Sequence, residues 1–292
     1  IGPIDSTYIK ELNNFNDLIF LSLSNIDSAF KENVVLMGIN LESQLIAINK
    51  FIKKNKKNKT IILYPDNDFS KYVEKNLNLV GIKNKKLFKY SEDPKKLTSQ
   101  IEKLTNYKQR KRNLESRIKK LENSDTNEDL RELELLKQKH TLGRVNFDSV
   151  VIIDFGNGLK SVLTSLAYTD VLGDDVLIIT ANQWFDKSIL NESSIKNFYF
   201  PSINFKNLKD FKKKFNEFYN YNPGDITILS YESVGLVYYF WKKNIQINSP
   251  KDFNIKNEIK GKIGNFIISD NKIIQKLDIY NLKENTFVKN NL

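Results

Sequence analysis

Residues 150–154 read Val-Val-Ile-Ile-Asp, and this short apolar run decides the fold because two similar runs flank it. Thr60-Ile-Ile-Leu-Tyr64 precedes it, Val176-Leu-Ile-Ile-Thr180 follows it, and amphipathic helical patterns occupy the chain between them. Short apolar runs rich in β-branched residues predict buried strands of a parallel sheet. Strands that alternate with helices predict an α/β protein with mostly parallel sheets.

The same alternation extends in both directions along the chain. It predicts strands at residues 16–24, 34–37, 60–64, 86–90, 147–153, 176–180, 198–201, 263–268, 273–280 and 286–288, and helices at 38–54, 69–79, 158–169, 205–220 and 230–243. Asp270-Asn271 separates two of these strands and indicates a β-hairpin. The helix at 205–220 carries an apolar stripe that we expect to face the core, made of Phe205, Leu208, Phe211, Phe215 and Phe218.

Between residues 94 and 143 the period becomes helical and no strand pattern appears. Apolar residues recur at four-three spacing, namely Leu97, Ile101 and Leu104, then Leu114, Ile118 and Leu121. A second predicted helix carries Leu130, Leu133 and Leu136. Residues 123–127 interrupt the pattern and offer helix caps. We therefore predict an inserted antiparallel helical hairpin at 95–143, whose first helix, 97–121, would be about 36 Å long.

Every arginine of the chain lies in or beside this segment: Arg110, Arg112, Arg117, Arg131 and Arg144. The planar guanidinium group suits carboxylates on a partner better than lysine does. We predict a partner-binding arm that uses Arg110, Arg112, Arg117 and Arg131. A long but inert crossover and a dimerising coiled coil remain open alternatives.

Composition limits the classes of function. The 292 residues are 40% hydrophobic with a mean hydropathy of −0.45, and no apolar run approaches the roughly 20 residues that span a bilayer, so we predict no transmembrane segment. The chain has no cysteine, which excludes disulfides, thiolate catalysis and cysteine zinc sites. The single histidine, His140, argues against a histidine metal site or catalytic relay. We predict neither a metal nor a cofactor.

The net charge of +11 comes mostly from scattered lysines. This distribution is typical of a solvated basic surface, whereas a nucleic-acid binder would more often cluster arginine with exposed aromatic residues. We expect no nucleic-acid partner. An acidic partner surface or anionic lipid headgroups remain open.

Motifs for catalysis are absent from the sequence. Asp154-Phe-Gly156-Asn-Gly158-Leu-Lys160-Ser161 follows a strand and opens a helix, but its glycine spacing fits neither a P-loop nor a dinucleotide fingerprint. No serine elbow, zinc helix or calcium loop occurs. We predict no catalytic residues and a protein that is not an enzyme.

Open α/β sheets bind ligands at the carboxyl ends of their strands. The polar and aromatic residues at these positions are Ser6, Ser24, Asn25, Phe69, Gly156, Asn182, Gln183 and Trp184. Their hydroxyls and amides could orient an amino acid or sugar, and their rings could cover its apolar part. They are the predicted ligand-binding residues, against the alternative that each is an ordinary loop residue.

Several segments, in this order, resemble the type I periplasmic-binding-protein fold of branched-chain amino-acid binding proteins. They are Ile1-Gly-Pro-Ile-Asp-Ser6, Ile19-Phe-Leu-Ser-Leu-Ser24, Ile61-Ile-Leu-Tyr-Pro-Asp66, Tyr231-Glu-Ser-Val-Gly-Leu-Val-Tyr-Tyr239 and Ile259-Lys-Gly261-Lys-Ile-Gly264. The resemblance implies two Rossmann-like lobes that close on a ligand by hinge motion. The first lobe would comprise 1–40 and 205–260, and the second 41–204 and 261–292, with the hairpin inserted in the second.

The resemblance also implies that the chain starts inside the first lobe, without the family's opening strand, helix and strand. We then expect the first lobe to be incomplete at its start, with a sheet edge and apolar surface left uncovered.

Two departures from the family pattern bear on function. Phe69-Ser70 stands where transporter-type members have a Tyr-Gly loop, and Gln183 where they have an acidic residue. The resemblance therefore favours the branch of penicillin-binding-protein activators, which are non-catalytic periplasmic proteins that contact a peptidoglycan synthase. The alternative is the substrate-binding subunit of an amino-acid-type ABC transporter, with a permease complex as partner and a small polar ligand. A cytoplasmic enzyme on a similar fold is the third and weakest hypothesis.

Overall fold

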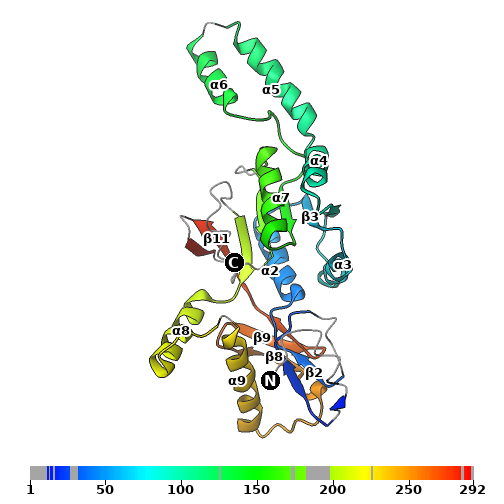
Figure 1. The fold of residues 1–292 in the computed structure, drawn as a ribbon, viewed down its shortest axis with the longest axis vertical. Coiled ribbons are helices and arrows are strands. Elements are labelled where there is room, and N and C mark those ends of the chain that lie inside the picture. Colours follow the sequence, from blue (N-terminus) through cyan, green and yellow to red (C-terminus); the bar gives the residue numbers. More distant parts are fainter. Residues whose placement is uncertain are drawn as a thin grey trace. The chain divides into compact units, whose positions relative to one another are not determined.

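The computed structural model of the chain describes residues 12, 14, 15, 17–26, 32–124, 126–171, 175–181, 198–224, 226–283 and 286–290. They divide into two compact units (Figure 1). Unit 1 is drawn from residues 1–48 and 201–279, and unit 2 from residues 49–200 and 280–290. Each unit contains helices and one sheet, so the predicted α/β class is confirmed.

The sheet of unit 2 contains seven of the described strands, in the order β12-β11-β7-β6-β5-β3-β4. Their bounds are β3 (Thr60–Pro65), β4 (Lys85–Tyr90), β5 (Ser149–Ile152), β6 (Leu177–Thr180), β7 (Phe198–Ser202), β11 (Asp278–Lys283) and β12 (Thr286–Asn290). The neighbours from β4 to β7 all run parallel. The three apolar runs that predicted the fold are β3, β5 and β6, side by side and buried at the centre of the sheet.

Helices of unit 2 begin and end where local chemistry dictates. α3 (Phe69–Val80) stops at Gly81, whose φ of 64° is a left-handed cap that glycine adopts at little cost. α7 (Gly156–Tyr168) buries Leu159, Val162 and Leu163. α4 (Pro94–Leu104) begins with Asp93, whose carboxylate accepts hydrogen bonds from the backbone N–H groups of Lys95 and Lys96.

The segment after α4 departs from the predicted hairpin. In place of one helix over 97–121, α4 ends and a new helix, α5 (Tyr107–Leu121), begins after Asn106, which has a left-handed φ of 52°. Leu104, Tyr107 and Leu114 keep helical spacings of three and seven residues across this break, so apolar periodicity does not reveal it. α4 packs against α7 as an ordinary crossover helix. The hairpin proper consists of α5 and α6 (Asn127–Lys137).

This hairpin has a small core of its own, formed by Leu114, Leu121, Leu133 and Leu136. Ile118 packs against the core from the same helix. Leu130, which the pattern placed with this set, is instead 47% exposed, so the apolar face of α6 is narrower than predicted.

The sheet of unit 1 contains five of the described strands, in the order β1-β2-β10-β9-β8. Their bounds are β1 (Phe20–Ser22), β2 (Val34–Leu36), β8 (Ile255–Lys260), β9 (Asn265–Ser269) and β10 (Lys272–Gln275). β1, β2 and β10 run parallel, whereas β9 pairs antiparallel with β8 and β10. The predicted hairpin turn is present, and both Asp270 and Asn271 have left-handed φ angles of 51° and 55°.

One predicted boundary is displaced. The family resemblance predicts residues 261–279 in the second lobe, but they belong to unit 1. The cause is strand pairing, because β10 joins β9 to β2 within the unit 1 sheet.

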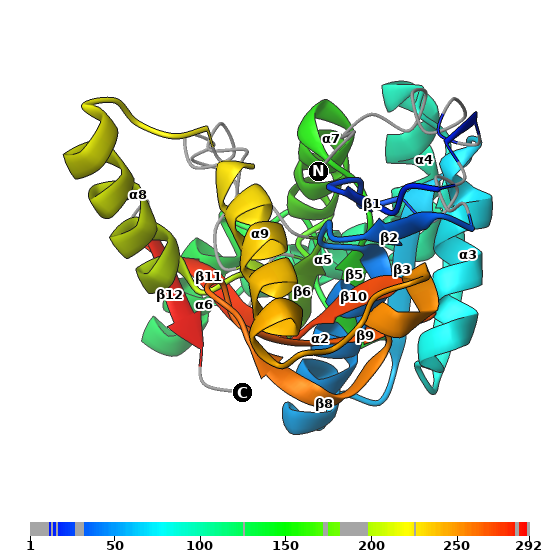
Figure 2. The same cartoon turned by 90° about the horizontal axis from the view of Figure 1, so that it is seen from below.

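Unit 1 contains α8 (Phe205–Tyr219), α9 (Thr227–Lys242) and the short 3₁₀ helix η4 (Pro250–Phe253), and α2 (Leu41–Lys54) continues from unit 1 into unit 2. Figures 1 and 2 both show α9 alongside β8 and β9. The Glu232 carboxylate of α9 accepts hydrogen bonds from the backbone N–H groups of Lys262 and Ile263, at 2.8 Å and 3.2 Å. This contact fixes the loop between the two strands.

The predicted core stripe of α8 is only partly buried. Leu208 and Phe211 are buried, whereas Phe218 is 82% exposed. α9 likewise exposes a row of large apolar side chains: Tyr231, Val234, Val237, Tyr238 and Trp241. Unit 1 therefore carries an extended apolar surface on these two helices.

The hairpin core gives a first prediction. Replacing the buried Leu133 with alanine should lower the free energy of local unfolding of α5 and α6 by about 2–3 kcal/mol, because it leaves a cavity among the four leucines. Hydrogen exchange of the α5 and α6 amides measures this quantity. Leu135→Ala is the control, since Leu135 is 63% exposed and should change exchange by about 0.5 kcal/mol or less. Equal effects of both substitutions would contradict the assigned core.

Candidate functional site

The carboxyl ends of β4, β3 and β5 meet at one edge of the unit 2 sheet. Tyr90 ends β4, and its hydroxyl donates a short hydrogen bond to Oδ2 of Asp154, which follows β5. The Oδ1 atom of Asp154 accepts a hydrogen bond of 2.8 Å from the backbone N–H of Phe155. The pair therefore joins strands that lie on either side of β3.

Burial shifts the pKa of both members of the pair. It raises the pKa of the Asp154 carboxyl, and the hydrogen bonds from Tyr90 and Phe155 oppose this only in part. Burial and the neighbouring carboxylate raise the pKa of the Tyr90 hydroxyl.

Two glycines follow Asp154, and each has its own structural reason. Gly156 opens α7 with a left-handed φ of 52°, a conformation that side chains disfavour. A side-chain carbon at Gly158 would collide with the Asp154 carboxylate. Of the two glycines in the candidate phosphate loop, Gly156 thus serves the turn into α7 and Gly158 the packing of this carboxyl group.

The loops after β3 and β4 complete the edge. The Asn67 side chain donates to Oε1 of Glu92 at 2.8 Å and accepts from the backbone N–H of Phe69 at 3.0 Å. The Phe69 ring lies 5.6 Å from that of Tyr72. Phe69 and Gly156, two of the predicted ligand-binding residues, therefore follow neighbouring strands of the unit 2 sheet.

The remaining predicted ligand-binding residues lie in unit 1 or outside the described residues. Ser24 and Asn25 follow β1 in unit 1, where Ser24 is buried and its hydroxyl accepts a hydrogen bond of 3.3 Å from the backbone N–H of Ile26. Ser6, Asn182, Gln183 and Trp184 lie outside the described residues. Ligand binding by this set stays a prediction.

Arg110 occupies the junction between the hairpin and the rest of unit 2. The predicted arm placed it among the partner-binding residues, but its side chain is only 6% exposed. Nε donates to the carbonyl of Gly143 at 2.9 Å, and the terminal nitrogens donate to the carbonyls of Thr169 and Asp170 at 2.9 Å and 3.4 Å. The guanidinium group is thus held inside unit 2 and is not presented to a partner.

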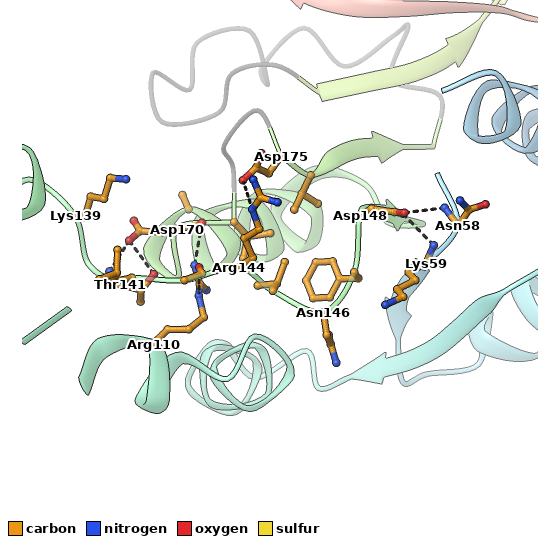
Figure 3. Close-up of a pocket in the computed structure, with 17 residues that line it drawn as sticks. Asn58, Lys59, Arg110, Lys139, Thr141, Arg144, Asn146, Asp148, Asp170 and Asp175 are labelled. Atoms are coloured by element: carbon orange, nitrogen blue, oxygen red, sulfur yellow. Dashed lines mark hydrogen bonds and ion pairs between the residues drawn. The ribbon is translucent and has the colours of Figure 1, made fainter. Parts of the chain in front are cut away.

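Asp170 also stabilises this junction, because its side chain binds the segment that follows α6 (Figure 3). It lies just past the carboxyl end of α7 with a left-handed φ of 54°. Its Oδ2 atom accepts hydrogen bonds from the backbone N–H groups of His140 and Thr141, at 2.8 Å and 2.6 Å. We call residues 138–148, which link α6 to β5, the connector.

The other arginines have different surroundings. Arg117 crosses the hairpin and forms a two-point ion pair with Glu132, with N–O distances of 2.9 Å and 2.6 Å. Arg144, in the connector, lies 3.5 Å from Oδ2 of Asp175, and both side chains are largely exposed. Arg112 and Arg131 are exposed on α5 and α6. These two retain the guanidinium groups that a partner could reach.

A cavity of about 820 Å³ lies between the connector, the start of α5 and the end of α7. Its charged lining comprises Lys59, Arg110, Lys139, Arg144, Asp148, Asp170 and Asp175. The sequence pattern does not predict this cavity, because residues from turns before β3, β5 and β6 meet only once the strands align. Tyr90 and Asp154 were missed for the same reason, although an aspartate directly after a buried strand is a signal that could have found the latter.

Within the described residues, no group of three or more histidine, aspartate or glutamate side chains could hold a metal ion. The helices among those residues include none that is long and apolar enough to cross a membrane.

The junction gives a second prediction. Arg110→Met keeps most of the apolar stem but removes three donors, and should lower the free energy of local opening of the connector by about 2–4 kcal/mol. Hydrogen exchange at the Leu142 amide, which donates to the Arg110 carbonyl, reports this opening. Arg112→Met, on the exposed surface of the same helix, should leave that exchange rate unchanged. Faster exchange in both variants would show that charge alone, and not the junction, is responsible.

The Asp154 carboxyl gives a third prediction, about pH. Its pKa is raised on folding, so its contribution to stability is present below the unfolded pKa and is lost as pH rises through the folded pKa. Asp154→Asn cannot ionise, and its free energy of unfolding relative to wild type should therefore increase between pH 4 and pH 7. Urea unfolding of both proteins across this range measures the difference. A difference that falls with pH would contradict the assignment.

Comparison with the models of known protein families gives no match, and no curated protein matches the sequence. Solved structures do match. The C-domain of LpoA from Haemophilus influenzae, described as a regulator of PBP1A, is 10% identical with a TM-score of 0.57, over 99% of this chain and 80% of that one. Full-length LpoA from the same organism is 11% identical with a TM-score of 0.59, over 99% and 47%. This chain thus spans about half the length of full-length LpoA.

A transport protein matches to a similar degree. The branched-chain amino-acid substrate-binding protein LivJ from Streptococcus pneumoniae, in complex with isoleucine, is 16% identical with a TM-score of 0.54, over 99% of this chain and 78% of that one. These two proteins are described as a regulator and as a substrate-binding protein. At these identities the similarity establishes the fold, and the chain has the type I periplasmic-binding-protein fold that the sequence motifs predicted.

Proposed function

We propose that the protein is a non-catalytic regulator that contacts a peptidoglycan synthase in the periplasm, in the manner of penicillin-binding-protein activators. The observation that carries this proposal is the α5–α6 hairpin, which extends from unit 2 with its own core and with Arg112 and Arg131 exposed (Figure 1). A simple crossover between β4 and β5 needs only α4, which already packs on α7. The similarity to LpoA, a regulator of PBP1A, supports the same function.

The construction of the hairpin suits a contact surface. Arg110 and Asp170 fix its base, and the ion pair between Arg117 and Glu132 joins its two helices. A surface held in this way loses little conformational freedom when a partner binds. Exposed arginines are enriched in protein interfaces, where their planar groups pair with carboxylates.

The alternative is the solute-binding subunit of an amino-acid-type ABC transporter. The carboxyl edge of the unit 2 sheet favours it, because Asp154, Glu92 and Phe69 gather there and carboxylates with an aromatic ring suit an amino acid. The similarity to LivJ supports the same alternative.

The fourth prediction separates the two functions. Arg112→Ser combined with Arg131→Ser should weaken binding to a PBP1A-type synthase by about tenfold, measured by surface plasmon resonance. The matched control, Lys206→Ser with Lys209→Ser, removes the same charge from exposed positions of α8 in unit 1 and should bind as wild type. Equal weakening by both pairs would indicate diffuse charge attraction and would count against the hairpin.

A ligand screen tests the alternative directly. An amino acid present at about 100 times its dissociation constant should add roughly 2.7 kcal/mol to the free energy of unfolding. Thermal unfolding against amino acids, small solutes and muropeptides would detect this. A stabilising amino acid together with no synthase binding would replace the regulatory function by solute binding.

A further inference from the structure

We propose that the cavity at the base of the hairpin binds an extended acidic peptide segment along the connector. The inference rests on the proposed function for the identity of the protein that carries the segment, and on the cavity for its chemistry. At about 820 Å³ the cavity falls within the range of sites that enclose a ligand, and its lining is drawn entirely from unit 2.

Two of the three acidic side chains of the lining already accept hydrogen bonds from backbone N–H groups. Asp148 accepts hydrogen bonds from the backbone N–H groups of Asn58 and Lys59, at 2.7 Å and 3.1 Å. These bonds lower the pKa of Asp148 even though burial opposes them. Asp170 likewise accepts hydrogen bonds from the backbone N–H groups of His140 and Thr141. Both carboxylates are therefore already bound to backbone donors, and the lining as a whole carries four basic side chains against three acidic ones.

Three of the four basic side chains of the lining retain the capacity to pair with an anionic ligand. Among the described residues, Lys59 and Lys139 form no ion pair. Arg144 pairs with Asp175 at 3.5 Å, but both side chains are largely exposed, and such pairs exchange partners at little cost. The cavity therefore offers three cations to a ligand, whereas the fourth, Arg110, is held by backbone carbonyls.

The arrangement of these cations favours an elongated ligand. Figure 3 shows Lys139 beside Asp170 at one end of the connector, Lys59 beside Asp148 at the other, and Arg144 between them. A small anion could meet only part of this row. A peptide with several carboxylates could meet all of it.

The backbone of the connector adds a second feature that points to a peptide. The N–H groups of residues 143–146 form no hydrogen bond with any residue that the structure describes. Main-chain N–H groups of this kind pair with the carbonyls of an extended segment, which gives affinity, while side-chain contacts give specificity. Here the specificity would be for acidic side chains.

Fluorescence anisotropy with a labelled, end-blocked peptide, Asp-Glu-Leu-Glu-Asp, tests the proposal on the full chain. The control peptide, Asn-Gln-Leu-Gln-Asn, has the same shape without charge and should bind about tenfold more weakly. The triple variant Lys59→Ser, Lys139→Ser, Arg144→Ser should weaken binding of the acidic peptide by about tenfold or more. A matched triple, Lys111→Ser, Lys119→Ser, Lys120→Ser, removes the same charge from exposed positions of α5 outside the cavity and should change binding less than about twofold.

Three results would overturn the proposal. One is no binding of the acidic peptide up to about 1 mM. Another is equal weakening by the two triple variants, which would indicate diffuse attraction by the basic surface. The third is binding of citrate or pyrophosphate to the cavity without binding of the peptide, which would make it a site for small anions. The assay contains no synthase, so a negative result would not contradict the proposed function. Loss of synthase binding alone, in turn, would not contradict the peptide site.

Discussion

The position of the hairpin depends on one buried guanidinium group. Arg110 lies at the start of α5 and donates to carbonyls in the connector and at the carboxyl end of α7. The end of a helix leaves carbonyls without partners and carries partial negative charge, so a cation there is stabilised twice. Asp170 satisfies the N–H groups of the facing connector in return. Three segments distant in sequence are thereby fixed together, and the cavity beside them is a consequence of that junction.

The five arginines illustrate how residues that look alike in sequence take different roles. Arg110 is structural, Arg117 joins the two helices of the hairpin, and Arg144 lines the cavity, while Arg112 and Arg131 face solvent. Their clustering was visible in the sequence, but their burial was not. Burial of Arg110 lowers its pKa, and the nearby Asp170 opposes that shift, so its environment differs from that of the others.

Much of the fold could be predicted from the sequence because buried parallel strands leave apolar runs that need no partner to be recognised. β3, β5 and β6 were found in this way, and the Asp270-Asn271 turn by its residue types. The break at Asn106 is not visible in the sequence because Leu104, Tyr107 and Leu114 keep helical spacings across it. The exposed end of α8 is not visible either, because an apolar stripe does not show how far the neighbouring core extends. Residues 261–279 went to the wrong unit because pairing of β10 with β2 joins residues far apart in sequence.

Regulators and solute-binding proteins share this fold, so function must be argued from the polar and charged groups that particular surfaces offer to a ligand. At the carboxyl edge of the unit 2 sheet, the polar groups are largely matched internally, since Tyr90 contacts Asp154 and Asn67 contacts Glu92. At the amino-terminal edge, the carboxylates are matched but the lysines and the connector amides are not matched by any described residue. A ligand at the first edge would have to displace existing bonds, whereas a ligand at the second would add new ones. Within unit 2 the balance therefore favours binding at the base of the hairpin, which is where a protein partner held by the hairpin would also lie.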